Sequence, residues 1–195
     1  MGIRSLKNNT FSRELALGSP AGNAYDCIGV VSLSTTSAAS IEFTSIPSTY
    51  AHLQVRFVAR TLNDSVILRL TINSDTGSNY ARHFLEGNAS AASSGAASGT
   101  TAPLAFAHVV HSDYAAAKFG SGILEILDYS NVNKYKTFRT LSGFDSNETP
   151  GGLPQGRVIL YSGLWQSTSA ITSIKIEGNG GNLAQHSHFA LYGIW

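Results

Sequence analysis

Charged side chains are scarce in this chain of 195 residues, and their scarcity excludes some functions. They make up 13% of the residues, about half the ~25% of an average globular domain, and the net charge is +1. Nucleic-acid binding through a basic surface is excluded, because neutralising phosphates requires clustered Lys and Arg. The 43% hydrophobic content is unlike that of disordered chains. A near-neutral surface rich in Ser, Thr and Gly gives little protection against association, which predicts a partner or an assembly.

Cysteine and long apolar runs are also missing. The single cysteine, Cys27, cannot form an internal disulfide, so nothing requires an oxidising compartment. Its apolar neighbours Ile28 and Val31 predict a buried thiol in a strand rather than a reactive nucleophile. No apolar segment follows Arg4 and Lys7, unlike in a secretory signal, and no run approaches the ~18 residues of a membrane span. The sequence therefore predicts no membrane partner.

Short segments of alternating hydrophobicity, separated by turn residues, dominate from Asp26 onward. In residues 65–73, Val66, Leu68, Leu70 and Ile72 alternate with polar residues, as in a strand with one buried face. Further strands are expected at residues 27–33, 39–46, 51–60, 80–85, 105–111, 122–128, 134–144, 157–165, 171–177 and 188–195. Many short strands without intervening helices predict an all-β fold, an antiparallel β-sandwich that is jelly-roll-like, over residues 26–195. A closed barrel is the alternative.

Two segments differ from this pattern. Residues 1–25 are largely polar, with the apolar residues Phe11, Leu15 and Leu17 interleaved, and they predict an extended N-terminal arm whose apolar residues contact a neighbour. A frayed terminus is the alternative. Residues 88–102 consist almost entirely of Ala, Ser, Gly and Thr, which predicts a flexible surface loop, either a spacer or a contact loop at the tip of the sandwich.

Motifs of enzymes and of bound cofactors are missing. The chain has no Gly-x-Ser-x-Gly nucleophile elbow, no phosphate-binding loop and no His-Glu-x-x-His helix, and the glycine-rich segment 178–181 predicts a hairpin turn. Asn73, Asp75 and Asn79 resemble part of a calcium loop, but position twelve is Phe84 instead of Glu, so an Asx turn is expected. We predict no catalytic residue and no cofactor. A hydrolytic pair of distant carboxylates stays open.

Two pairs of histidines have spacings that could suit a metal. On one strand, His186 and His188 would face the same side, whereas His108 and His111 would face opposite sides. Neither pair has a carboxylate nearby at a suitable spacing. We therefore predict ordinary polar strand positions and no metal site.

Aromatic residues make up 10% of the chain. Exposed Tyr and Trp can serve as stacking platforms for sugars, because a ring supplies apolar area with a polar tip. Tyr161, Trp165, Tyr192 and Trp195 lie in apolar strands, where core packing is expected. Tyr114 and Tyr129 lie beside turn residues, and we expect these two to be exposed and available for interaction.

Three segments carry a resemblance to a known group of proteins. They are IEFTSIPSTY at residues 41–50 with its continuation to Arg56, NSDTGSNY at residues 73–80, and LYG at residues 191–193. The chain resembles small β-rich structural proteins of tailed bacteriophages over most of residues 38–195. The resemblance implies a head decoration (cement) protein or a tail or fibre module, and in either case a homotrimer.

A decoration protein fits this chain better than a fibre does. The sequence combines one weakly charged β domain with an arm and has no repetitive shaft. The resemblance then implies a non-enzymatic virion protein that is made in the host cytoplasm. It would bind the major capsid protein at the outer surface of the head and stabilise the shell. The alternative is a tail or fibre module that binds a receptor or glycan through residues such as Tyr114 and Tyr129.

Overall fold

The computed structural model describes residues 24–147 and 154–195, and every regular element in these ranges is a β-strand. The twelve strands are β1 (Tyr25–Ser32), β2 (Ser40–Phe43), β3 (His52–Ala59), β4 (Ile67–Ile72), β5 (Tyr80–Gly87), β6 (Ala92–Thr100), β7 (Leu104–His108), β8 (Gly120–Leu127), β9 (Lys136–Asp145), β10 (Gly156–Trp165), β11 (Ile174–Gly178) and β12 (His188–Ile194). The all-β prediction is confirmed.

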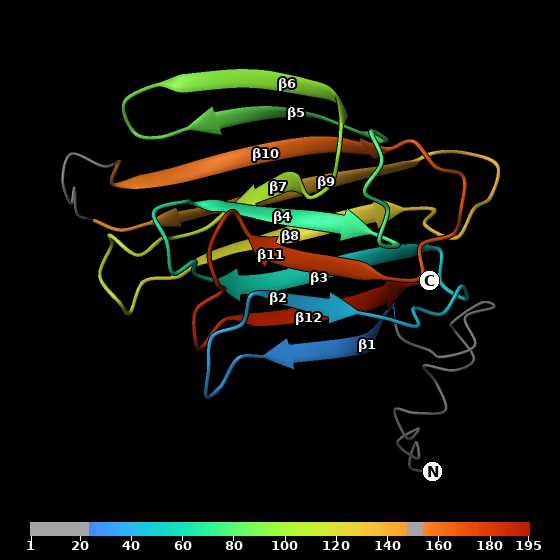
Figure 1. Cartoon of the computed structure of the whole chain (residues 1–195), viewed down its shortest axis with the longest axis horizontal. Helices are drawn as coiled ribbons and strands as arrows, with labels where there is room; N and C mark the ends of the chain where they lie inside the picture. The colour runs from blue at the N-terminus through green and yellow to red at the C-terminus, as the bar shows by residue number, and fades with distance from the viewer. Residues whose placement is uncertain (1–23, 148–153) are drawn as a thin grey trace, which may run out of the picture.

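The strands form two antiparallel sheets of unequal width. The larger has eight strands in the order β1-β12-β3-β8-β9-β10-β5-β6, and the smaller has four in the order β2-β11-β4-β7. In Figure 1 the smaller sheet lies in front of the middle of the larger one, while β5 and β6 extend beyond it at the top. The antiparallel β-sandwich is therefore confirmed. The jelly-roll topology stays a prediction, since the strands divide eight and four.

The core lies between the two sheets, and alternation in the sequence decides which side chains enter it. In β4, Leu68, Leu70 and Ile72 are fully buried, as the pattern of residues 65–73 predicts. In β3, Leu53 and Val55 point from the larger sheet into the same core. Because successive side chains of a strand point to opposite faces, the other face of the larger sheet is left to be covered by something else or by solvent.

The segment predicted as a flexible loop, residues 88–102, instead contains the edge strand β6. Its backbone pairs with β5 along most of its length, from Ala92 opposite Gly87 to Thr100 opposite Tyr80. The Asn88 side chain forms the turn between them, accepting hydrogen bonds from the backbone N–H groups of Ser90 and Ala91. Ala, Ser and Gly have low strand propensity. The loop prediction is wrong because pairing with β5 outweighs that propensity.

Three further predictions of burial are wrong near the N-terminal edge of the larger sheet. Tyr192 is only half-buried, on the face that the smaller sheet does not cover, where Arg56 lies over its ring. Cys27 is exposed, since it lies in the edge strand β1 on the face that the smaller sheet does not cover. Trp195 follows β12 and is 37% exposed, with its ring packed edge-on against Tyr50. Residues 1–23 lie outside the described residues, so the arm and its residues Phe11, Leu15 and Leu17 stay a prediction.

Candidate interaction surface

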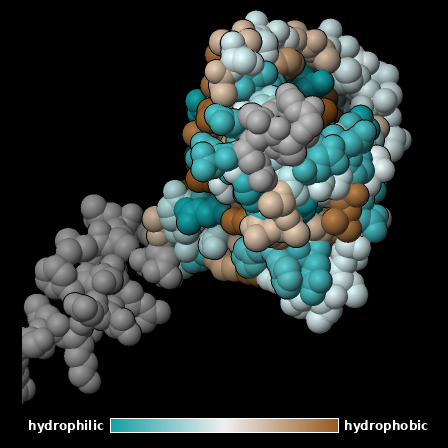
Figure 2. All heavy atoms as spheres, turned by 90° about the vertical axis from the view of Figure 1, so that its left-hand side faces the viewer, coloured by the Kyte–Doolittle hydropathy of each residue, from teal (hydrophilic) through white to brown (hydrophobic). Residues whose placement is uncertain are grey.

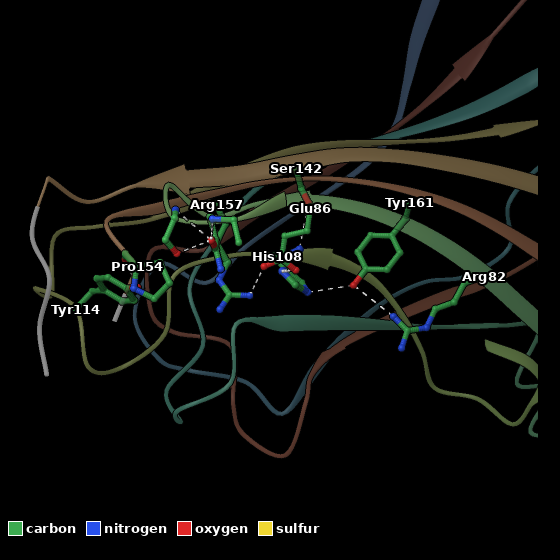
Figure 3. A network of polar contacts seen from close by, with 11 residues as sticks. Arg82, Glu86, His108, Tyr114, Ser142, Pro154, Arg157 and Tyr161 are labelled. Carbon is green, nitrogen blue, oxygen red and sulfur yellow. Dashed lines mark hydrogen bonds and ion pairs between the residues drawn. The ribbon is translucent and has the colours of Figure 1, made fainter. Parts of the chain in front are cut away.

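A cluster of polar side chains joins the edge of the smaller sheet to the larger one (Figure 3). His108 on β7 lies with its Nε2 atom 3.0 Å from the hydroxyl of Tyr161 on β10. Arg82 on β5 donates to that same hydroxyl oxygen at 3.3 Å. Glu86 on β5 forms an ion pair of 2.6 Å with Arg157 on β10. The cluster therefore connects three strands from both sheets.

His108 is neutral in this cluster. Burial, together with the positive charges of Arg157 and Arg82, lowers its pKa from 6.5 to about 3. The Tyr161 hydroxyl and Nε2 share a hydrogen bond whose direction depends on which ring nitrogen carries the proton. Glu86 lies 3.8 Å from Nδ1, beyond hydrogen-bonding distance, and its charge is already balanced by Arg157.

Access decides what this cluster can do. His108 is 5% exposed and Tyr161 is 1% exposed. A general base must come within hydrogen-bonding distance of the group it deprotonates, and neither residue offers a substrate that approach. The cluster instead fixes the position of β7 against β5 and β10. We assign it a structural role.

The histidine pairs and the acidic turn are also accounted for locally. His188 lies in β12 and its Nδ1 atom is 2.8 Å from the Ser32 hydroxyl, while His186 precedes the strand with a φ of 71°, so the two do not share a strand face. Gly77 donates its backbone N–H to Asp75, which confirms the Asx turn. Within residues 24–147 and 154–195, no three His, Cys, Asp or Glu residues are grouped as metal ligands.

The predicted exposure of Tyr114 and Tyr129 is wrong. Tyr114 is 3% exposed and Tyr129 is fully buried. The Tyr114 hydroxyl donates to the carbonyl of Pro154 at 2.7 Å, and the Tyr129 hydroxyl donates to the carbonyl of Pro47. Both rings lie beneath the loops that their hydroxyl groups anchor, so a position beside turn residues in the sequence did not mean exposure.

The candidate interaction surface is the face of the larger sheet that the smaller sheet does not cover, which we call the outer face. In its centre four aliphatic side chains stand in one row across neighbouring strands, because direct cross-strand partners share a face. The row consists of Ile123 on β8, Leu141 on β9, Leu160 on β10 and Leu85 on β5. We call these four residues the aliphatic row.

The rows on either side of the aliphatic row differ in size and polarity. One side carries the polar row of Glu125, Arg139, Ser162 and His83 on the same four strands. The other side carries the small row of Ser121, Gly143, Val158 and Gly87, where only Val158 is large. These four residues line a groove of about 930 Å³ together with Ile123 and Leu141.

The aliphatic row and Val158 expose an unusual amount of apolar surface. Their side chains are between 42% and 63% exposed. Fully burying one such side chain contributes ~1.5–3 kcal/mol, so covering these five half-exposed residues would contribute about 5 kcal/mol per copy. Contiguous exposed apolar surface marks sites of association. Sugar platforms use aromatic rings, and none lies in these three rows, so the outer face suits a protein partner.

Polar and aromatic side chains lie near the aliphatic row and at the end of the sandwich. The end of the sandwich seen in Figure 2 shows hydrophilic and hydrophobic residues interspersed, with neither kind covering it alone. On the outer face, Arg56 is placed over the rings of Tyr25 and Tyr192, 5.1 and 5.0 Å from their centroids. Arg56 therefore covers one face of each ring.

The sequence contained a sign that the outer face is apolar, which the expectation of alternating strands obscured. Residues 123–127 and 158–161 are almost continuously apolar instead of alternating with polar residues. Such a run predicts a strand with two apolar faces. The smaller sheet covers only one of them.

Comparisons of the chain with protein-family models, with curated proteins and with solved structures find no match. In the described part of the chain, no helix has the length and hydrophobicity to cross a membrane.

Proposed function

We propose that this protein is a structural subunit of a virion that decorates the outer surface of the head and stabilises the shell. The outer face carries this proposal. Its aliphatic row is a surface for protein contact built on a rigid sheet, whereas the buried polar cluster around His108 is closed to a substrate. The resemblance to phage structural proteins supplies the location. It assigns the contact with the major capsid protein to the predicted arm, residues 1–25, and leaves the outer face for contact with other copies of the subunit.

The low charge supports the same function. A decoration subunit is covered by neighbouring copies and by the shell, so its contact surfaces lose water when it assembles. Charged groups at such surfaces would have to be paired, or they would lose their hydration without compensation. The 13% of charged residues and the net charge of +1 keep that cost small.

Cosedimentation tests the proposal. The purified protein is mixed separately with heads and with tails isolated from the same virus, and the pelleted fraction is measured. We expect it to pellet with heads and to raise the temperature at which heads lose their DNA. Pelleting with tails alone, or with neither, would contradict the proposal.

A matched variant tests the predicted arm. Removing residues 1–23 leaves all described strands intact. If the arm holds the subunit on the shell, the shortened protein should bind heads at least about tenfold more weakly. Equal binding by both proteins would show that the arm has no such function.

The alternative, a tail or fibre module that binds a receptor or glycan, is less well supported. Its candidate residues Tyr114 and Tyr129 are buried. Tyr135 is exposed, and it is the residue on which this alternative would now depend. Binding on a glycan array that Tyr135→Ala abolishes would favour it over the decoration protein.

A further inference from the structure

The arrangement of the outer face is self-complementary. The aliphatic row runs in the order Ile123, Leu141, Leu160, Leu85, and its midpoint lies between β9 and β10. A two-fold axis that passes over this midpoint, parallel to the strands, places Leu141 opposite Leu160 of a second copy. We propose that two copies of this chain pack through their outer faces about this axis. The biological setting of this pair rests on the proposed function. The pairing adds that the partner of the outer face is a second copy of the chain.

The charges in the polar row agree with this axis. It places Glu125 opposite His83 of the second copy and Arg139 opposite Ser162. A carboxylate faces an imidazole, and a guanidinium faces a hydroxyl oxygen that can accept its hydrogen bond. No like charges meet in any of the three rows. An isologous contact requires this kind of self-match, because each residue meets its partner twice.

Side-chain size agrees as well. Val158, the only large residue of the small row, lies opposite Gly143 of the second copy, which lines the groove described above. The axis also brings β3 opposite β6. Arg56 on β3 then faces Ser94 on β6, and Val58 faces Ala92. The Ala, Ser and Gly residues of β6 thus make room for the longer side chains of β3.

The area is sufficient for a stable pair. Six strands from β3 to β6, spaced ~4.8 Å apart and rising ~3.3 Å per residue, cover about 800 Å². A standard protein interface buries about 800 Å² on each partner. An axis parallel to the strands keeps the strand axes of the two sheets aligned. Aligned packing, with a rotation of ~30°, is one of the arrangements that sheet faces adopt.

Complementary charge variants test this pairing. In the proposed pair, residue 141 of one copy faces residue 160 of the other at two equivalent places. Leu141→Lys alone or Leu160→Glu alone places a charge against leucine twice, so we expect each variant to associate at least about a hundredfold more weakly than the wild type. In a mixed pair of the two variants, the introduced ammonium meets the introduced carboxylate at one place, and leucine meets leucine at the other. An equimolar mixture should therefore pair again.

Analytical ultracentrifugation provides the measurement. We expect about 41 kDa for the wild type and for the mixture, and 20.6 kDa for each variant alone. Val30→Glu is the matched control: Val30 is exposed in β1 on the same face and aligned with Arg56 through Ala190, but it lies beyond the strands that the second copy covers. It should stay at the mass of the pair. Thermal melts check that all variants fold.

Three outcomes would overturn the pairing. They are a wild-type mass of 20.6 kDa at all concentrations, a trimer mass as the resemblance predicts, and a mixture that stays monomeric. Head binding is measured separately, so a protein that pellets with heads as a monomer or trimer would overturn the pairing and leave the proposed function standing. A pair that binds no heads would do the reverse.

Discussion

Acidification should destabilise this protein through His108, whose buried ring stays neutral in the folded state. The pKa of the folded ring is about 3, and its ordinary value in an unfolded chain is 6.5. Below pH 6.5 the unfolded state therefore binds a proton that the folded state does not, and the free energy of unfolding falls as the pH falls. The loss begins near pH 6.5 and stops growing near pH 3. Between pH 7.5 and pH 5 it amounts to about 2 kcal/mol.

The structure explains why the His108 ring is neutral in the folded state. Its ring lies between Arg82 and Arg157, which repel a third positive charge, and the nearby carboxylate of Glu86 is already paired with Arg157. Both effects, with burial, favour the neutral ring.

Urea unfolding at pH 7.5 and pH 5.0 measures this loss. For a slope of ~2 kcal/mol per molar urea, the loss corresponds to a midpoint lower by about 1 M. His108→Gln keeps an acceptor for Tyr161 but cannot titrate, so it should remove that part of the pH dependence. Burial also lowers the pKa of His111, so His111 adds a further loss of stability on acidification. This contribution is the same in the wild type and in His108→Gln.

The matched control is His188→Gln, which changes an exposed histidine on β12, a strand that the second copy does not cover. It reports how far the exchange itself alters unfolding. The reasoning is refuted if His108→Gln and wild type lose the same stability between pH 7.5 and pH 5.0.

Three further changes have consequences that thermal or urea unfolding can check. Asp75→Ala removes the acceptor of the buried Trp165 indole N–H, 2.7 Å away, and should cost about 2–3 kcal/mol, whereas Asp75→Asn should recover part of it. Gly163→Ala would place a Cβ atom 2.0 Å from the buried ring of Phe138 and should cost about 1–3 kcal/mol; an unchanged midpoint would contradict this packing. Deleting residues 190–195 removes most of β12, which lies between β1 and β3, and should leave the protein insoluble, while a soluble folded product would disprove that the fold requires β12.

Local pattern was enough to predict most of the architecture. Short apolar or alternating segments between turn residues predicted eleven of the twelve strands. Where only one face of a strand is buried, the period of two follows from the backbone. The Asx turn at Asp75 was predictable for a similar reason: an Asp side chain reaches the N–H group two residues along. These features depend on neighbours in the sequence.

Exposure was harder to predict, because it depends on which surface another part of the chain covers. Tyr114 and Tyr129 lie beside turns yet are buried under Pro154 and Pro47, and Cys27 lies in an apolar segment yet is exposed. Strand β6 exists because β5 offers it a backbone to pair with. None of these contacts leaves a trace in local hydrophobicity.

The sequence by itself determined that the chain is weakly charged and rich in strands, and it predicted association. Only the tertiary structure decided which apolar surface stays open. A strand with two apolar faces shows no preference for either, and the choice was made when the four-stranded sheet covered one face of the eight-stranded sheet. The register between strands then lined up Ile123, Leu141, Leu160 and Leu85, residues far apart in sequence, as one row on the face that remained open.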